Sequence, residues 1–302
     1  MDWKDKLTQI VKKPPLWDEP LSGYTSIGIG GRAESLVFPQ SHAELQSILS
    51  LTEEFALPFF ILGAGTNLLI RDGGIKGIVI SLSSLSSYYS FNHQTLSAGA
   101  AVPLSLLAKM AARRDLKGLE FAAGIPGSLG GALYMNAGAF GFSIGEFVRE
   151  AEIMDYDGNT KTLRHQELKF AYRQSCFQNC KAIILGAVLE LSPSDGGESK
   201  NILHNNRLER RSKQPALPSA GSVFCNPPGL SAGKLLDDLG VKGLRAGGAM
   251  VSLEHANFVV NTGDATASDV LSLIEKLQDK VRKAYKIDLS LEIVVVGEDI
   301  KN

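Results

Sequence analysis

The sequence lacks the features of several special classes of protein. It contains no apolar run near the ~20 residues that span a bilayer. Its first residues, Met1–Lys6, are charged where a signal peptide needs an apolar segment. Only 3 of the 302 residues are cysteine, which does not suit a disulfide framework. We therefore expect a protein of the cytoplasm that does not bind a membrane.

The sequence also lacks an excess of either charge. It has 31 Lys and Arg against 32 Asp and Glu, a formal net charge of -1, which argues against a nucleic-acid-binding protein. With 44% hydrophobic and 21% charged residues, the composition is that of an ordinary packed globular protein and not of a disordered one. A chain of 302 residues suggests about two domains.

Strand and helix patterns alternate in the first part of the chain, which indicates an α/β or α+β protein rather than an all-β one. A buried strand is predicted over 182–191, and the breaker-rich residues 192–197 give the best candidate domain boundary. Beyond it, a long amphipathic helix begins near Thr266. Residues 287–296 alternate in polarity, which predicts a final strand with Glu292 on its polar face.

Glycine is abundant, with 31 residues, and eight of them lie between positions 118 and 145. Two segments are of special interest. In the first, an apolar run ends in Gly63-Ala64-Gly65-Thr66-Asn67; the second, over 124–131, contains four glycines, a proline and a serine. Loops without bulky side chains expose backbone N–H groups and let a diphosphate or a flat ring approach closely. Both segments therefore predict cofactor binding, with a purely structural turn as the alternative for each.

Three weaker patterns are discounted. Residues 28–33 fit G-x-G-x-x-A, but a polar turn precedes them where a Rossmann site needs a buried strand, so a tight loop near a ligand or a packing loop is favoured. Residues 229–235 lack the glycine spacing and the Ser or Thr of a P-loop. Cys176 and Cys180, with Cys225 far along the chain, have no neighbours that complete a tetrahedral metal set, so no metal is expected.

Three single residues are candidates for chemistry. Arg173 lies in Ala-Tyr-Arg-Gln-Ser, Ser222 follows a glycine in a turn, and Glu292 lies in an otherwise apolar segment. From pattern alone, each also has a plain structural explanation, as a surface arginine, a turn serine and a solvated glutamate.

Taken together, these segments resemble one family, the UDP-N-acetylenolpyruvoylglucosamine reductases, also called UDP-N-acetylmuramate dehydrogenases. One glycine-rich loop would be weak evidence, whereas an ordered series from about residue 20 to 297 is specific. The matching segments, in family order, are 29–33, 62–69, 123–139, 172–177, 210–215, 220–227, 256–258 and 291–292.

The resemblance implies an α+β fold, namely the vanillyl-alcohol-oxidase/PCMH-type FAD-binding fold with an additional α+β substrate-binding domain. The FAD-binding domain would comprise residues 1–195, in two subdomains divided near 82, and the substrate-binding domain residues 196–302. Related flavin enzymes attach FAD through His or Cys. Neither glycine-rich loop contains one, so non-covalent FAD is expected. A monomer is expected.

The resemblance also implies an activity. It is the NADPH-dependent, FAD-mediated reduction of UDP-N-acetylglucosamine enolpyruvate to UDP-N-acetylmuramate in peptidoglycan synthesis, which serves cell wall biogenesis, cell shape and cell division. Hydride would come from flavin N5. Arg173 would stabilise negative charge at the substrate carboxylate, Ser222 would donate the proton, and Glu292 would complete the polar cluster.

The family's ligand contacts transfer to this sequence residue by residue. The expected cofactor contacts are Gly63, Ala64, Gly65, Thr66, Asn67, Leu68, Gly124, Ile125, Pro126, Gly127, Ser128, Gly131, Asn136 and Ala137. The expected substrate contacts are Tyr172, Arg210, Lys213 and Asn226. No tyrosine lies between Arg173 and Ser222, as in the branch of the family without an extra tyrosine loop, so the group that closes the site is left open.

Two functions of other kinds stay open. One is a different flavin enzyme on the same scaffold, such as an oxidase of a hydroxy acid or a sugar, whose reduced form would react rapidly with oxygen. The other is a non-enzymatic nucleotide-binding protein, which would be colourless and would not respond to NADPH.

Overall fold

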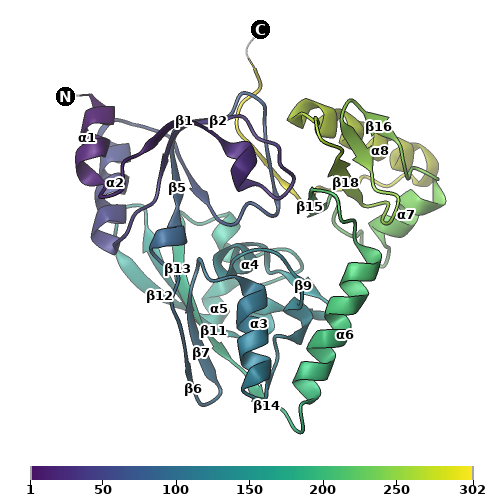
Figure 1. Cartoon of the computed structure of the whole chain (residues 1–302), viewed down its shortest axis with the longest axis horizontal. Coiled ribbons are helices and arrows are strands. Elements are labelled where there is room, and N and C mark those ends of the chain that lie inside the picture. Colours follow the sequence, from purple (N-terminus) through teal and green to yellow (C-terminus); the bar gives the residue numbers. More distant parts are fainter. Residues whose placement is uncertain (1, 301–302) are drawn as a thin grey trace. The chain divides into compact units, whose positions relative to one another are not determined.

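The computed structural model describes residues 2–300, which divide into two compact units that alternate along the sequence (Figure 1). Unit 1 comprises the residues up to Leu16, Ser35–Ala64 and Gly77–Arg210. Unit 2 comprises Trp17–Glu34, Gly65–Lys76 and the residues from Arg211 on. None of the helices within 2–300 has the length and apolar character needed to cross a membrane.

The α-helices and strands follow one another in mixed order along the chain. They are α1 (Trp3–Ile10), β1 (Leu16–Pro20), β2 (Arg32–Val37), α2 (His42–Glu54), β3 (Phe59–Leu62), β4 (Leu68–Ile70), β5 (Ile75–Ser81), β6 (Tyr89–Asn92), β7 (Thr95–Gly99), α3 (Leu104–Arg113), β8 (Leu116–Lys117), α4 (Leu129–Met135), β9 (Gly138–Ala139), β10 (Phe142–Ser143), β11 (Val148–Asp155), β12 (Thr160–Arg164), α5 (His165–Leu168), β13 (Ala182–Glu190), β14 (Ser192–Pro193), α6 (Glu198–Lys213), β15 (Ser219–Ser222), α7 (Ala232–Asp238), β16 (Arg245–Ala246), β17 (Ala249–Val251), β18 (Phe258–Asn261), α8 (Ala267–Tyr285) and β19 (Val294–Val296).

The division into units differs from the domain boundary expected after residue 195. The chain leaves unit 1 only after Arg210, inside α6, and the segments 17–34 and 65–76 belong to unit 2. Long-range strand pairing explains the second of these segments, because β4 pairs in parallel with β19 near the other end of the chain. A cluster of Ser, Pro and Gly indicates where the chain turns and contains no information about such pairing.

The N-terminal part of unit 1 supports the loop that follows β3. Here β3 pairs in parallel with β5, with Phe59 opposite Ile78 and Leu62 opposite Ser81. Apolar residues of α1, α2, β3 and β5 form one buried cluster. The pairing ends at Leu62, so the chain enters the loop from a fixed strand end.

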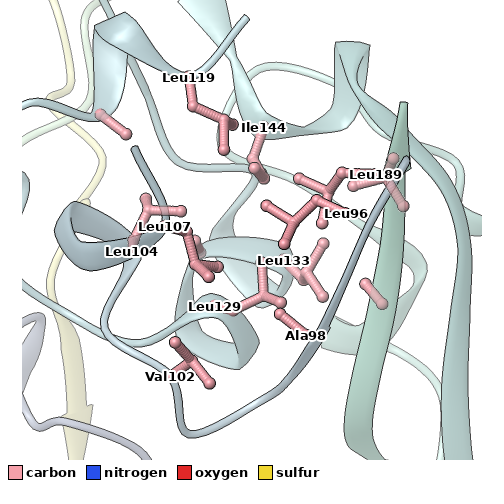
Figure 2. Close-up of a cluster of buried hydrophobic side chains, with 14 of the residues drawn as sticks. Leu96, Ala98, Val102, Leu104, Leu107, Leu119, Leu129, Leu133, Ile144 and Leu189 are labelled. Atoms are coloured by element: carbon pink, nitrogen blue, oxygen red, sulfur yellow. The ribbon is translucent and has the colours of Figure 1, made fainter. Parts of the chain in front are cut away.

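The larger sheet of unit 1 has the strand order β12-β11-β13-β7-β6, and all its neighbours are antiparallel. Asp157 and Gly158 lie in the turn of the hairpin that joins β11 to β12. Leu129 and Leu133 of α4 and Leu96 and Leu189 of the sheet are fully buried in one cluster (Figure 2). Full burial of a leucine is worth ~1.5–3 kcal/mol, so this core fixes α4 against the sheet.

Unit 2 contains a four-stranded antiparallel sheet in the order β15-β18-β17-β16. The long helix α8 contacts β16 and β17, and α7 contacts α8 (Figure 1). The predicted apolar stripe of α8 is confirmed, because Val270, Ile274, Leu277 and Val281 are all buried. The side chain of Thr266 caps the helix, which begins where the sequence predicted.

The strand predicted over 287–296 is wrong for most of its length, because only Val294–Val296 forms a strand, β19. Leu289 and Ile293 are buried, whereas Leu291 is 37% exposed. Leu291 makes an isolated bridge with Phe224. The alternating polarity of the sequence predicted strand pairing, but it is also compatible with an unpaired segment that buries only some of its apolar side chains, here Leu289 and Ile293.

Candidate active site

The loop after β3 offers backbone donors in unit 1. Gly63 and Ala64 are exposed, and their N–H groups donate no hydrogen bond within residues 2–300. A Cβ atom at Gly63 would lie 3.5 Å from Ser128 Oγ. The structure therefore brings the two glycine-rich segments together at the end of β3.

The second glycine-rich segment offers more donors beside the first. Gly124 and Gly127 have φ of +73° and +125°, which L side chains rarely adopt. Among the described residues, the N–H groups of Gly124, Gly127 and Ser128 also lack an acceptor. Ser128 Oγ accepts the Gly131 N–H at 3.4 Å and caps α4. Clustered peptide N–H groups without side chains suit a diphosphate or a ring edge, so these residues fit a dinucleotide such as FAD.

Two of the predicted cofactor residues, Asn136 and Ala137, also have contacts within the protein. Asn136, 5% exposed, ends α4 with φ +44° and donates through Nδ2 to the Ala171 carbonyl at 2.8 Å. Its Oδ1 accepts the Gly145 N–H at 2.9 Å. Ala137 donates its N–H to the Ala132 carbonyl. Asn136 and Ala137 thus hold the C-terminal end of α4.

The first glycine-rich segment continues into unit 2. A Cβ at Gly65 would lie 1.9 Å from the Tyr24 carbonyl oxygen, so this glycine is required by close backbone packing. Asn67 Nδ2 donates to the Glu292 carbonyl oxygen at 2.9 Å. Leu68 begins β4. Residues 65–68 therefore shape unit 2 around Glu292.

Arg173 lies in a tight turn of unit 1. Ala171 and Gln174 exchange backbone hydrogen bonds of 3.1 and 3.0 Å across it. Arg173 has φ +55°, and its Nη2 donates to the Gly138 carbonyl at 3.1 Å. Its guanidinium carbon lies 5.1 Å from the ring centroid of Tyr172. The turn presents a half-buried guanidinium beside an exposed aromatic ring.

Arg210 lies against the second glycine-rich segment. A Cβ at Gly124 would be 3.7 Å from its Cδ and 3.8 Å from its Nε. Burial lowers the pKa of Arg210, and the positive charge of Arg173 lowers it further. Arginine stays protonated near neutral pH, so two guanidinium groups and one loop create a positively charged corner in unit 1. Such a corner favours an anionic ligand.

Ser222 and Glu292 are brought together in unit 2. Ser222 ends β15, and the backbone N–H of Glu292 donates to the carbonyl of Val223, the next residue, at 2.8 Å. The Ser222 side chain is half-buried, and within residues 2–300 its hydroxyl makes no hydrogen bond. A serine hydroxyl held in this way is available to a bound molecule.

Asn257, to which the sequence analysis assigned no role, supports this arrangement. It is 4% exposed, and its Oδ1 accepts the Phe224 N–H at 3.0 Å while its Nδ2 donates to the Phe224 carbonyl at 2.8 Å. Its own carbonyl accepts the Val223 N–H at 2.8 Å. Since Asn is also a common turn residue, no local signal revealed that its amide fixes the segment after Ser222.

Asn257→Ala should lower the free energy of unfolding by about 1–3 kcal/mol, because it leaves the buried N–H and C=O of Phe224 without these partners. Urea unfolding of the purified protein measures this. Asn205→Ala, at an exposed position of α6, is the matched control and should be near neutral. Equal stability of the two variants would contradict the supporting role of Asn257.

The remaining predicted substrate residues lie on exposed parts of both units. Tyr172 is 54% exposed, and Lys213 is exposed at the end of α6. Asn226 is exposed, and its Oδ1 accepts the Ala232 N–H at 3.0 Å where α7 begins. Along the chain, Tyr172 directly precedes Arg173, and Asn226 closely follows Ser222.

The discounted patterns have structural explanations. A Cβ at Gly31 would lie 2.4 Å from the Asp72 carbonyl, and β2 rather than a helix follows, so the packing loop is confirmed over a Rossmann site. Burial and the neighbouring Cys180 raise the pKa of the Cys176 thiol to about 11. In the part of the chain described, no group of three or more His, Cys, Asp and Glu side chains could hold a metal ion.

Comparison with known proteins gives consistent matches along the chain. A family model described as "UDP-N-acetylenolpyruvoylglucosamine reductase, C-terminal domain" matches residues 213–296, and one described as "FAD binding domain" matches residues 33–164. The UDP-N-acetylenolpyruvoylglucosamine reductase of Caldanaerobacter subterraneus subsp. tengcongensis is 44% identical over 296 residues, covering 97% of this chain and 98% of that protein.

Other relatives agree. The reductase of the same name from Listeria innocua is 44% identical over 287 residues, covering 93% of this chain and 95% of the relative. The crystal structure of the UDP-N-acetylenolpyruvylglucosamine reductase of Thermus caldophilus superposes with a TM-score of 0.77 at 35% identity, covering 93% of this chain and 97% of that one. The predicted α+β fold with a FAD-binding domain is confirmed. The chain belongs to the UDP-N-acetylenolpyruvoylglucosamine reductase family of flavin-binding oxidoreductases.

Proposed function

We propose that this protein reduces UDP-N-acetylglucosamine enolpyruvate to UDP-N-acetylmuramate, with NADPH as the reductant and non-covalently bound FAD as the cofactor. Similarity over 97% of the chain to a reductase of this name supports the substrate. The observation that carries the proposal is the half-buried Ser222 hydroxyl, which makes no hydrogen bond within residues 2–300, in a segment whose next residue, Val223, accepts the backbone N–H of Glu292.

The peptide groups of the two glycine-rich segments would hold FAD. The N–H groups of Gly63, Ala64, Gly124, Gly127 and Ser128 are the candidate donors to its diphosphate or its ring edge. Bound FAD would take up the reducing equivalents of NADPH and supply the hydride. Since these donors are backbone groups, the main contribution of glycine and alanine is that their small side chains leave the N–H groups accessible to the cofactor.

Arg173 would bind the carboxylate of the enolpyruvyl group. The reaction adds hydride to the terminal carbon of the double bond, so negative charge develops at the neighbouring carbon and its carboxylate. A guanidinium held at a fixed point stabilises that charge more in the transition state than in the ground state. Arg210, on the same side of the Gly124 loop, would strengthen the positive potential there.

Ser222 would complete the addition by donating its hydroxyl proton to the carbon next to the carboxylate. A serine is a weak acid, but its recipient is a strongly basic enolate, so position matters more than acidity. Glu292, joined to Val223 through the backbone, would complete the polar cluster around this hydroxyl. Tyr172, Lys213 and Asn226 would contact the UDP-sugar.

The cellular setting follows from the same proposal. The product is a peptidoglycan precursor, so the protein would act in the cytoplasm and serve cell wall biogenesis, cell shape and cell division. The formal net charge of -1 supports a protein that binds neither nucleic acid nor a membrane. We expect a monomer with residues 196–302 as the substrate-binding domain.

Anaerobic titration tests the function directly. The purified protein should be yellow, should bleach with NADPH, and should regain its colour when the enolpyruvyl UDP-sugar is added, with UDP-N-acetylmuramate as the product. Rapid reoxidation by oxygen with no response to the sugar would instead indicate an oxidase. A colourless protein that cannot be loaded with FAD would indicate a nucleotide-binding protein.

Gly131→Leu should weaken FAD binding by about tenfold or more, equivalent to ~1.4 kcal/mol. Gly131 is exposed in the first turn of α4, and a Cβ there lies 3.6 Å from Ser128 Oγ, so a leucine would cover the donors of the loop. Leucine also favours a helix over glycine, so the apoprotein should not lose stability. Flavin fluorescence quenching measures the affinity.

The matched control for this variant is Ser105→Leu, an exposed position in the first turn of α3. It should bind FAD as the wild type does. Unchanged FAD affinity of Gly131→Leu would place the cofactor away from this loop.

A further inference from the structure

The turn that presents Arg173 is attached to the C-terminal end of α4. Ser175 Oγ donates to the Tyr134 carbonyl at 2.8 Å, and Asn136 Nδ2 donates to the Ala171 carbonyl at 2.8 Å. The other end of this seven-residue helix begins at Ser128, in the second glycine-rich segment. One short helix therefore links the candidate cofactor loop to the turn with the arginine.

Gln178 adds a hydrogen bond to Arg173 itself. It lies in the 3-10 helix Cys176–Gln178, directly after the turn. Its Nε2 donates to the Arg173 carbonyl at 2.9 Å, to the Tyr134 carbonyl at 3.3 Å and to the Met135 Sδ at 3.6 Å. A single amide nitrogen thus bridges the backbone of the arginine and the last turn of α4.

The backbone of Arg173 is in a conformation that needs such support. Its φ of +55° lies in the left-handed region, which non-glycine residues enter only when surrounding contacts hold them there. Glycine would adopt this conformation without strain, but glycine has no guanidinium. The Nη2 atom of Arg173 donates to the Gly138 carbonyl at 3.1 Å. Because the guanidinium is carried by this strained backbone, its position depends on how firmly the backbone is held.

We propose that Gln178 is a positioning residue, which holds the carbonyl of Arg173 against α4 and so fixes the guanidinium relative to the cofactor loop. This inference rests on the proposed function, in which Arg173 binds the substrate carboxylate. A group that is displaced by about 1 Å can lose about 10²-fold in rate. Gln178 acts through Arg173 and does not contact the substrate.

Gln178→Met tests the inference, because methionine keeps the length of the side chain and removes the amide donor with all of these hydrogen bonds. NADPH should reduce its flavin within about twofold of the wild-type rate, while reoxidation by the enolpyruvyl UDP-sugar should slow by about 10- to 100-fold. The loss should fall mainly on kcat, with KM changing by less than about threefold, since charge develops only in the transition state. Gln178→Glu, which also lacks the donor at neutral pH, should behave in the same way.

The matched control is Gln174→Met, the same change in the same turn. Gln174 is exposed, and its side chain makes no hydrogen bond within the described residues. This variant should keep wild-type rates in both half-reactions. If both Gln178 variants also keep wild-type rates, or if they lose flavin reduction equally, the positioning role is wrong.

Two further measurements separate positioning from a general loss of structure. The Arg173→Lys/Gln178→Met double variant should be reoxidised less than about twofold more slowly than Arg173→Lys alone, because the two changes act through one group. Fully multiplicative losses would contradict the inference.

In the apoprotein, Gln178→Met should speed hydrogen exchange at the Ala171 and Gln174 amides, which close the turn. Unchanged exchange there would also overturn the inference.

The two proposals fail in different ways. If the sugar does not reoxidise the wild-type protein, the proposed function is wrong, and the exchange measurement still decides whether Gln178 holds the turn. If the sugar reoxidises the wild type but Gln178→Met equals Gln174→Met, only the positioning role is wrong.

Discussion

Ser222→Ala should separate the two half-reactions. Its flavin should be reduced by NADPH at close to the wild-type rate, whereas reoxidation by the enolpyruvyl UDP-sugar should slow by about 10²- to 10⁴-fold, the usual contribution of a positioned proton donor. The hydroxyl makes no hydrogen bond within residues 2–300, so its removal leaves no described partner unsatisfied. Anaerobic stopped-flow absorbance at the flavin band measures both rates.

The control for this experiment is Ser219→Ala, at the other end of β15. It should leave both half-reactions close to the wild-type rates. A fall of equal size in both half-reactions of Ser222→Ala would show that the residue supports the fold or the cofactor and does not donate the proton. Solvent deuterium should slow wild-type reoxidation more than flavin reduction, because only reoxidation takes a proton from Ser222.

The sequence predicted those parts of the site that depend on local chain geometry. Gly63 follows a strand, and Gly124 lies in a segment with little side-chain bulk; both facts are readable from neighbouring residues. The structure brings the two loops together, with a Gly63 Cβ position 3.5 Å from Ser128 Oγ. A glycine-rich loop at a strand end has few alternative geometries, so its backbone donors could be predicted without a partner.

Parts that depend on distant contacts could not be predicted in this way. The pairing of β4 with β19 moves residues 65–76 into unit 2, and no pattern near either strand indicates it. Asn136 stays a predicted cofactor contact, and the bonds of its amide to Ala171 and Gly145 appear only in the structure. A polar residue in a loop has the same local signature whether its partner is a ligand or a backbone carbonyl many residues away.

The residues around Arg173 show the same limit. The resemblance identified the arginine, but its left-handed backbone and the bond from Gln178 appear only in the structure. Side chains that fix a site act through partners in space, and their spacing in the chain is not characteristic. The sequence therefore indicated the candidate residues, but not the contacts that position them.

Arg173→Met should lower kcat of the complete reaction by about 10²- to 10³-fold, the usual effect of removing one group that stabilises a developing oxyanion. Methionine preserves much of the apolar stem but neither the charge nor the paired donors. Arg173→Lys should lose less, because it keeps the charge without the planar fork. Steady-state kinetics with the enolpyruvyl UDP-sugar measures the effect, and Arg207→Met, at an exposed position of α6, is the charge-matched control.

Arg210 makes this prediction more specific. The charge of Arg173 partly lowers the pKa of Arg210, so the two guanidinium groups lie near one another in unit 1, with Arg210 beside Gly124. If both bind one anion, the Arg173→Met/Arg210→Met double variant should lose less than the product of the two single losses. If the loss of the double variant equals the product of the two single losses, the two arginines bind separate groups of the substrate. A single Arg173→Met variant within about threefold of the wild type would exclude Arg173 from the reaction.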